Sequence, residues 1–356
     1  MTAENTLALE VGGNSYQGWL SATVHRSIEQ AAANFALTLT ASWPGESNPI
    51  RIHPGDRCEI LIGDDYVLTG WIDTVDIGHS GGDHTIAVAG RSLTADLVDC
   101  SAAPGQMLNR TLPQIATALS NPYNINVLDE VGLTDTIKRF APDTGETIFA
   151  CIERLARDQS VLVTDDTTGN LVLTRVGTMS GPDLTHPGNI LQSRLACDMS
   201  RRYTEYRIKG QSAGDDQNWG EMVAQSESAI TDSGIARYRP LILRAERQAN
   251  NAICKRRAVW EAVTRAGRSA QVDITVQGWR DVDGNLYEVN RVCRVVDPVI
   301  GVDADLLVVS VEFTLDEAGM LTTLMLAPPG AYEPTPPDSR ATAITVGIGP
   351  WAGVGS

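Results

Sequence analysis

Hydrophobic residues recur at every second position through much of the first hundred residues. This alternation is typical of strands that bury one face, because successive side chains of a strand point to opposite sides. Turn-forming clusters separate the runs, as at Pro54–Asp56 and Gly63–Asp65. The pattern predicts about six short antiparallel strands forming a β-barrel domain over residues 1–98. The alternating residues are Leu7, Leu9, Val11, Phe35, Leu37, Leu39, Ile60, Ile62, Val67, Ile72, Ile77, Ile86 and Val88.

The hydrophobic period changes between residues 99 and 188, where helical spacing and strands mix. Thr111 can cap a short helix, because its hydroxyl is able to accept a hydrogen bond from the first helical turn. Asp143 and Glu146 have the spacing of a capping box, which predicts that a second helix begins at Asp143. Two apolar runs around a glycine-containing turn predict a hairpin over residues 161–174. We therefore expect a small α+β module here.

Strand patterns return between residues 189 and 327, with one helical stretch among them. Apolar residues at helical spacing predict one long helix over residues 243–268. A second antiparallel β-barrel domain that includes this helix fits the pattern. After residue 327 proline, glycine, alanine and threonine dominate, which predicts an extended tail over residues 328–356. The expected strands are 203–209, 222–226, 272–279, 286–296, 306–315 and 321–326. The expected fold class is therefore mainly β, with two antiparallel β-barrel domains and a small α+β insert.

Composition and charge narrow the function. The chain has 356 residues, with 28 Lys+Arg against 44 Asp+Glu and a net charge of −16. A protein that binds exposed nucleic acid needs clustered basic residues to neutralise phosphates, and docking on anionic lipid needs them too, so both classes are disfavoured. Hydrophobic residues make up 42% of the chain, which indicates a folded body and not a disordered acidic chain.

The termini and the cysteines give no sign of export. The first residues lack a basic stretch followed by an apolar core, so we expect no secretory signal. No apolar run reaches the roughly 18 residues that a membrane-spanning helix needs. The six cysteines lie 39 or more positions apart, without the close pairing typical of zinc or iron–sulfur sites, so we expect reduced thiols and no metal.

Three motifs resemble chemical sites, and each has a simpler interpretation. Gly210–Gly214 spells G-x-S-x-G, but all five histidines precede its serine, and a hydrolase of that fold places the histidine afterwards. Asp281–Asn285 starts like a calcium loop but lacks its later glycine and glutamate, so a hairpin turn between strands ending at Trp279 and beginning at Leu286 fits better. His79 and His84 flank a Gly-Gly turn with no third ligand nearby. We expect no catalytic residue, no cofactor and no metal.

One segment departs from the overall charge. Between residues 241 and 270 there are seven basic residues against two acidic ones, in a chain of −16. Such separation of charge suits contacts between copies of one acidic protein, or with an acidic neighbour. A solvated helix face with ion-pair partners in its own domain is the alternative, and contact with nucleic acid is a further one. The candidate interface residues are Arg244, Arg247, Lys255, Arg256, Arg257, Arg265 and Arg268.

The order of several short motifs resembles the baseplate hub protein of Mu-like contractile-tailed phages, related to hub proteins of other myophages and to the hub part of type VI secretion spikes. These motifs run from about residue 10 to residue 297 and leave the C-terminal tail outside. They are Trp19 with Val24–Glu29, Pro54–Asp56, Thr69–Asp73, Arg91–Cys100, Gly145–Thr147 with Ile152–Ala156, Gly169–Leu171, Gly188–Ile190, Arg237–Pro240, Arg257–Glu261, and Gly278–Trp279 before Asp283–Gly284.

The resemblance implies a homotrimeric ring in which each subunit contributes two β-barrel domains. Three subunits then present six barrels, matching a sixfold tail tube on one side and a threefold spike on the other. The implied partners are further copies, the spike, the tail tube and other baseplate proteins, with DNA only as transiting cargo. The implied location is the tail baseplate of a virion that is assembled in the host cytoplasm.

Two other functions stay open at this point. One is a cell-wall carbohydrate hydrolase of the baseplate, for which the sequence offers no site. The other is a β-rich receptor-binding adhesin, for which seven tryptophans are available. These tryptophans are scattered along the chain, which favours core packing over a binding face.

Overall fold

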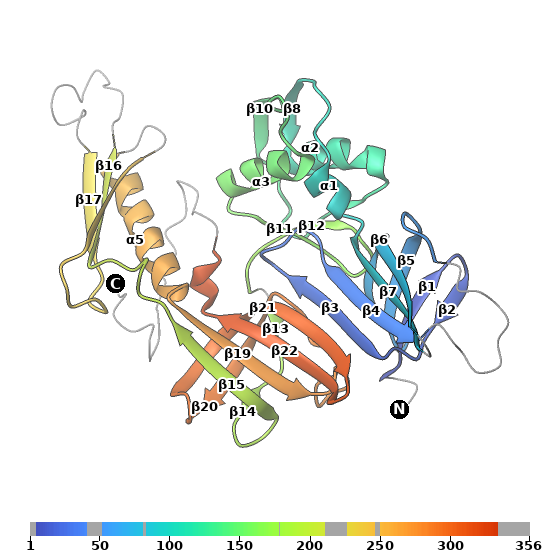
Figure 1. Cartoon of the computed structure of the whole chain (residues 1–356). Coiled ribbons are helices and arrows are strands. Elements are labelled where there is room, and N and C mark those ends of the chain that lie inside the picture. Colours follow the sequence, from blue (N-terminus) through green and yellow to red (C-terminus); the bar gives the residue numbers. More distant parts are fainter. Residues whose placement is uncertain are drawn as a thin grey trace.

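The computed structural model describes residues 5–40, 52–80, 83–177, 179–210, 226–245 and 250–333. The fold is mainly β with few helices, as expected from the alternating pattern. In Figure 1 two groups of strands form the base, a small helical region lies above the first group, and a helix packed on a small sheet lies at the far end of the second.

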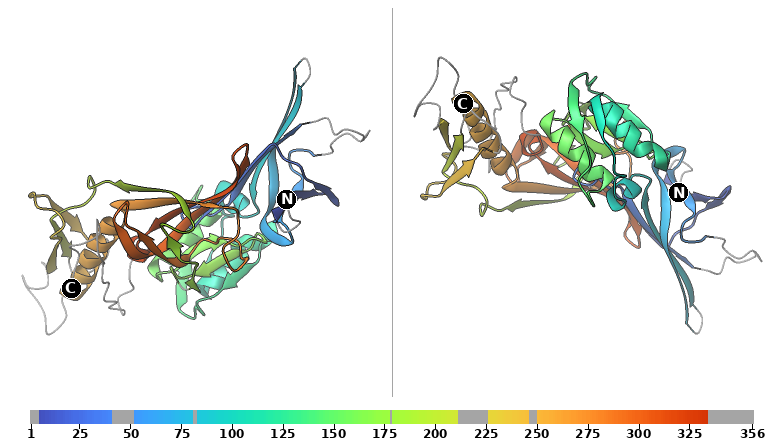
Figure 2. Two further views of the ribbon diagram at one scale, coloured as in Figure 1. Left: turned by 90° about the horizontal axis from the view of Figure 1, so that it is seen from below. Right: turned by 90° about the horizontal axis from the view of Figure 1, so that it is seen from above.

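The first group of strands follows the predicted alternation. Leu7, Leu9 and Val11 are all buried, as are Phe35, Leu37 and Leu39. Ile77 is an exception to the predicted inward set, since its side chain is 69% exposed. It lies on the long hairpin of the sixth and seventh strands, which projects from the body of the molecule (Figure 2). The strands are β1 (Leu7–Val11), β2 (Asn14–Tyr16), β3 (Ser21–Ser27), β4 (Asn34–Thr40), β5 (Arg57–Ile62), β6 (Asp65–Ser80) and β7 (Asp83–Ser92).

The second group comes from the C-terminal third of the chain and from a stretch before it. Four of its strands pair antiparallel in the order β15-β19-β22-β21, and β20 pairs with β21. The strands are β13 (Met179–Ser180), β14 (Leu184–Thr185), β15 (Ile190–Cys197), β19 (Ala270–Gln277), β20 (Arg291–Asp297), β21 (Val302–Asp316) and β22 (Gly319–Ala327).

The prediction of two closed barrels is not confirmed. Strand β21 pairs with β20 through Val302–Leu307 and with β3 through Ser310–Leu315, so both groups belong to one 14-stranded sheet. A bulge between Val308 and Ser310 marks the change of partner. Among the described residues no pairing closes either group on itself. The length of β21, 15 residues, is the physical reason: one strand is long enough to serve both groups.

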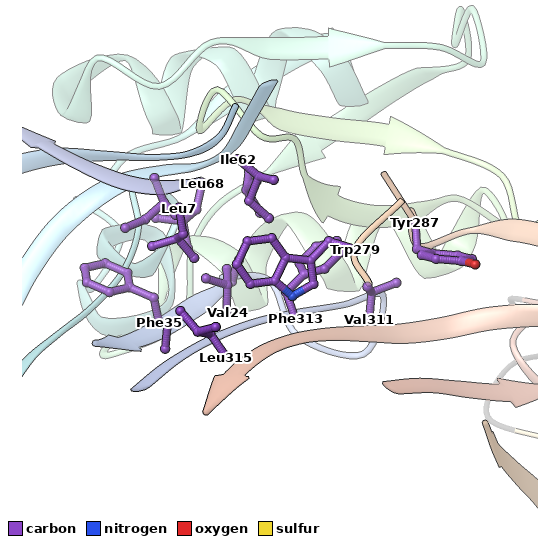
Figure 3. Close-up of a cluster of buried hydrophobic side chains, with 14 of the residues drawn as sticks. Leu7, Val24, Phe35, Ile62, Leu68, Trp279, Tyr287, Val311, Phe313 and Leu315 are labelled. Carbon is purple, nitrogen blue, oxygen red and sulfur yellow. The ribbon is translucent and has the colours of Figure 1, made fainter. Parts of the chain in front are cut away.

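One hydrophobic core crosses the junction of the two groups. Trp279, from the C-terminal group, is 1% exposed and its indole N–H donates to the Thr314 carbonyl oxygen at 3.0 Å. It packs in one buried cluster with Val24, Ile62 and Phe313 (Figure 3). Since residues from both ends of the chain share this cluster, the two groups are held in a fixed relation.

The middle of the chain forms the expected α+β module, with a core of its own. Thr111 caps its second helix in a complete capping box with Gln114, as the sequence predicts for Thr111. The next helix begins five residues later than predicted, because the Thr147 hydroxyl and not the Asp143 carboxylate accepts from the first turn. The elements are α1 (Ala95–Asp99), β8 (Met107–Thr111), α2 (Leu112–Ser120), η2 (Asn121–Tyr123), β9 (Val127–Asp129), β10 (Thr136–Phe140), α3 (Ile148–Asp158), β11 (Leu162–Asp165) and β12 (Leu171–Thr174).

The predicted long helix over 243–268 is shorter and lies in a unit of its own. Helix α5 (Asn251–Gly267) begins after Asn250, whose side chain accepts from the Ile253 N–H at 3.0 Å. It packs on a three-stranded sheet in the order β17-β16-β18, and not on the large sheet. The strands are β16 (Glu205–Gly210), β17 (Ser226–Thr231) and β18 (Pro240–Arg244). The predicted helical residues 243 and 244 therefore belong to a strand.

Two further expectations meet the structure only in part. Trp279 and Leu286 do not lie on paired strands, since Arg280 and Leu286 form one isolated bridge and β20 begins at Arg291. The start of the predicted tail is ordered, because a 3₁₀ turn, η3 (Pro329–Ala331), packs against α5. Residues 334–356 and most of the predicted strand 222–226 lie outside the described residues.

Candidate interface surfaces

The unit that contains the basic segment is built around a buried ion pair. The Arg202 guanidinium donates through Nε and Nη2 to the Asp232 carboxylate at 2.6 and 2.9 Å, and both side chains are within 1% of complete burial. Asp232 also accepts from the Gly234 N–H at 2.8 Å. Next to this pair, the Tyr203 N–H donates to the Tyr206 hydroxyl at 3.0 Å, and burial raises the pKa of Tyr206 to about 12. Buried polar contacts therefore hold this unit together.

Two of the predicted interface arginines are neutralised inside this unit. Glu261 is 4% exposed and lies on α5 one turn from Arg257 and one turn from Arg265. It accepts from Arg257 at 2.9 Å and from Arg265 at 2.8 Å. Arg257 also lies over the Trp260 ring at 4.6 Å. The alternative of ion-pair partners within the same domain therefore holds for these two residues.

Arg268 is used to hold the chain that follows the large sheet. Its Nε donates to the Ala331 carbonyl oxygen at 3.0 Å, and its guanidinium lies 5.4 Å from the Tyr332 ring centre. The Trp260 indole N–H donates to the Glu333 carbonyl oxygen at 2.8 Å. Burial raises the pKa of Tyr332 and of Glu333. Residues 328–333, which we call the strap, thus tie α5 to the large sheet.

The remaining predicted residues lie on different faces. Arg244 is exposed on β18, on the side of the small sheet away from α5, in register with Lys209 of β16. Lys255 is exposed on α5, and Arg256 beside it is half-buried. Arg247 lies outside the described residues. The structure therefore does not bring the six described residues together into one patch.

The junctions between the parts were not predicted from the sequence. Arg26 of β3 donates to the backbone oxygen of Asp165 at 3.0 Å, and the Asp165 carboxylate accepts from the Ala33 N–H at 3.2 Å. Arg280 pairs with Asp65 at 2.7 Å. Each of these contacts joins residues more than a hundred positions apart, so no local pattern could have indicated them.

The structure places the described residues of the motifs that resembled chemical sites in turns and on strands. Asp281 accepts from the N–H groups of Asp283 and Asn285, which closes a turn. His79 and His84 are partners in the backbone register of the β6–β7 ladder. Gly210 ends β16, and the rest of its G-x-S-x-G motif lies outside the described residues. Within the described ranges no three metal-binding side chains come together.

The cysteines and helices add two observations. All six cysteines are free thiols, and burial raises the pKa of Cys58 and Cys293 to about 12. In the part of the chain that the structure describes, no helix is long and apolar enough to span a membrane.

Comparison with known proteins identifies the class to which this architecture belongs. The family profile described as "Mu phage baseplate assembly protein GpP-like, N-terminal" matches residues 6–92. "Baseplate hub protein gp44-like, second domain" matches residues 94–175, and "Mu phage baseplate assembly protein GpP, fourth domain" matches residues 250–335. The chain is therefore a structural protein of a phage tail baseplate.

The relatives define the family more closely. The chain is 32% identical over 336 residues to "Baseplate hub protein gp44" of Escherichia phage Mu, covering 91% of this chain and 88% of that protein. It is 33% identical to the 43 kDa tail protein of prophage MuSo2 from Shewanella oneidensis, with a TM-score of 0.83 over 93% of this chain and 100% of that one. The chain belongs to the family of Mu-type baseplate hub proteins, which confirms the resemblance seen in its sequence motifs.

The fold extends beyond phages. The Escherichia coli c3393 protein, described as a component of the type VI secretion system, is 11% identical with a TM-score of 0.56 over 95% of this chain and 81% of that chain. At this level of identity the likeness concerns the fold alone.

Proposed function

We propose that this hub protein assembles as a homotrimeric ring that joins the sixfold tail tube to the threefold spike. The observation that supports the proposal most directly is the pairing of β21 with β3, which fixes two β-rich groups of each chain in one sheet. Two such groups per chain give six around a threefold axis, so one ring can meet a sixfold neighbour and a threefold neighbour. The α+β module and the α5 unit extend from this base and are available for other baseplate proteins (Figure 1).

The ring also forms the channel through which DNA leaves the tail. The net charge of −16 supports this part of the proposal, because an acidic wall repels phosphates and keeps DNA from adhering. We expect the purified protein to show no retardation of duplex DNA in a gel-shift assay at low salt. Retardation at micromolar protein would contradict the acidic channel.

Contacts between copies involve Lys255, an exposed basic residue of α5. Lys255 makes no salt bridge with the described residues, whereas Arg257 and Arg265 both pair with Glu261. The surface carboxylates of an acidic neighbouring copy are the complementary partners.

The solution mass tests the ring. Light scattering after gel filtration should give about 115 kDa, three times the 38.2 kDa of one chain. A strictly monomeric protein at tens of micromolar would refute the ring. Lys255→Glu should weaken the trimer, whereas Lys138→Glu, which changes an exposed lysine on β10, should leave it unchanged.

A further inference from the structure

A cleft of about 850 Å³ opens where three parts of the chain meet. Its lining comes from the β5–β6 turn, from β3 and β21, from β11 and β12, and from the segment 284–291 that precedes β20. These segments come from the N-terminal, middle and C-terminal parts of the chain. The cleft therefore exists only because of the junctions between these parts described above. Its volume lies within the range typical of ligand sites.

The three-stranded sheet β11-β12-β9 turns its second face to this cleft. Val163, Leu171 and Leu173 point to the core of the α+β module. Thr164 and Val172 alternate with them and are paired in register, so they lie on the opposite face, and both line the cleft. This face contains polar as well as apolar side chains, unlike the module's core.

Two buried polar atoms at the cleft have no partner. The Thr164 hydroxyl is one of them, in a residue that is only 7% exposed. The other is Nε of Arg26, whose Nη2 is already bonded to Asp165. Within the described residues neither atom has a hydrogen bond, and leaving such groups buried and unpaired costs free energy. A ligand with a hydrogen-bond acceptor for Arg26 and a donor or acceptor for Thr164 would satisfy both.

The rim of the cleft is acidic. Among its lining carboxylates, Asp65 is paired with Arg280 and Glu288 is paired with Arg291. Asp64 and Glu130 are exposed lining residues that have no ion pair in the described part of the chain. A cationic group on the ligand would be attracted to these two carboxylates.

We infer that this cleft binds an extended, lysine- or arginine-containing segment of another baseplate protein. A peptide backbone supplies the carbonyl that Arg26 Nε lacks and the N–H or carbonyl that the Thr164 hydroxyl lacks, and a basic side chain meets Asp64 and Glu130. A second copy of this chain is a poorer source, because its exposed Lys255 lies on helix α5 and not in an extended segment. The inference rests on membership of the hub family and not on the trimeric ring.

Overlapping 15-residue peptides test the inference. They cover the other tail proteins encoded with this chain and also this chain itself, and each is titrated with the full-length protein by fluorescence polarisation. We expect binding peptides to come from another protein and to contain Lys or Arg. Asp64→Asn with Glu130→Gln should weaken their binding about 2- to 30-fold. Glu10→Gln with Glu317→Gln, two exposed carboxylates outside the cleft, should leave it unchanged.

Thr164→Val separates ligand binding from folding. Its hydroxyl makes no internal hydrogen bond, so the variant should unfold at or above the wild-type temperature while binding the same peptides about 2- to 10-fold more weakly. The inference is overturned if no peptide binds, if only peptides of this chain bind, or if the cleft variants bind as the wild type does. Because solution mass tests the ring and peptide titration tests the cleft, failure of one is distinguishable from failure of the other.

Discussion

The buried ion pair of the α5 unit offers a stringent test of the structure. Arg202 and Asp232 are almost completely buried and share two hydrogen bonds. Replacing Asp232 by asparagine keeps the shape of the side chain but removes its charge, and one amide nitrogen then faces the guanidinium donors. The variant therefore removes the carboxylate that pairs with a buried arginine cation.

The expected cost is about 3–5 kcal/mol, the range for removing one partner of a buried pair. This free energy corresponds to a rise of about a hundredfold to a few thousandfold in the population of the opened α5 unit. Replacing both residues, as in Arg202→Met with Asp232→Leu, removes both buried charges, so the double variant should be more stable than Asp232→Asn alone.

Native-state hydrogen exchange measures this opening directly. The backbone N–H groups of β16 and β17 pair with each other, so their protection reports on the unit that contains the pair. We expect the protection factors of the β16 and β17 amides in Asp232→Asn to fall by about a hundredfold to a few thousandfold. The protection factors of the β6 and β7 amides in the large sheet should change little. Asp303→Asn, which breaks an exposed pair with Arg294, serves as the matched control and should cost less than about 1 kcal/mol.

Either of two outcomes would refute the reasoning. If Asp232→Asn lowers protection no more than Asp303→Asn does, the pair is not buried as the structure has it. If β6 and β7 lose protection equally, the α5 unit does not open independently of the large sheet.

Three further predictions concern other parts of the chain. Trp279→Ala should destabilise the protein by about 3–5 kcal/mol in a single urea transition, because its indole lies in the core shared by both strand groups; separate transitions for the two groups would contradict a shared core. The Arg154 guanidinium lowers the pKa of Glu146 from 4.5 to about 2, so Glu146→Gln should reduce the free energy of unfolding at pH 7. The difference in unfolding free energy between wild type and variant should shrink below pH 4.5 and vanish near pH 2. An unchanged difference at pH 2 would refute this prediction. Cys197 is exposed and should react with a thiol reagent at pH 8 in the folded protein, whereas Cys58 should react only after unfolding, and equal rates would count against its burial.

Local patterns were sufficient for several elements. The Thr111 cap, the hairpin of β11 and β12 and the alternation of β1 follow from interactions between residues a few positions apart. Local patterns were less reliable for the first residue of a helix, because several neighbouring polar residues can act as the N-cap. Thr147, and not the predicted Asp143, caps α3. Helix α5 is capped by Asn250, although the apolar residues are already at helical spacing from residue 243, within β18. The hydrophobic period alone does not determine at which residue a helix begins.

The sequence by itself determined the mainly β class, the acidic surface and the order of motifs that identify the hub family. Only the tertiary structure decided that β21 joins two strand groups into one sheet, that Glu261 neutralises two of the predicted interface arginines, and that Arg26 and Thr164 meet at one cleft. The physical reason is distance along the chain. Strand patterns and caps depend on neighbours, whereas sheet order, ion-pair partners and clefts depend on packing between residues up to hundreds of positions apart.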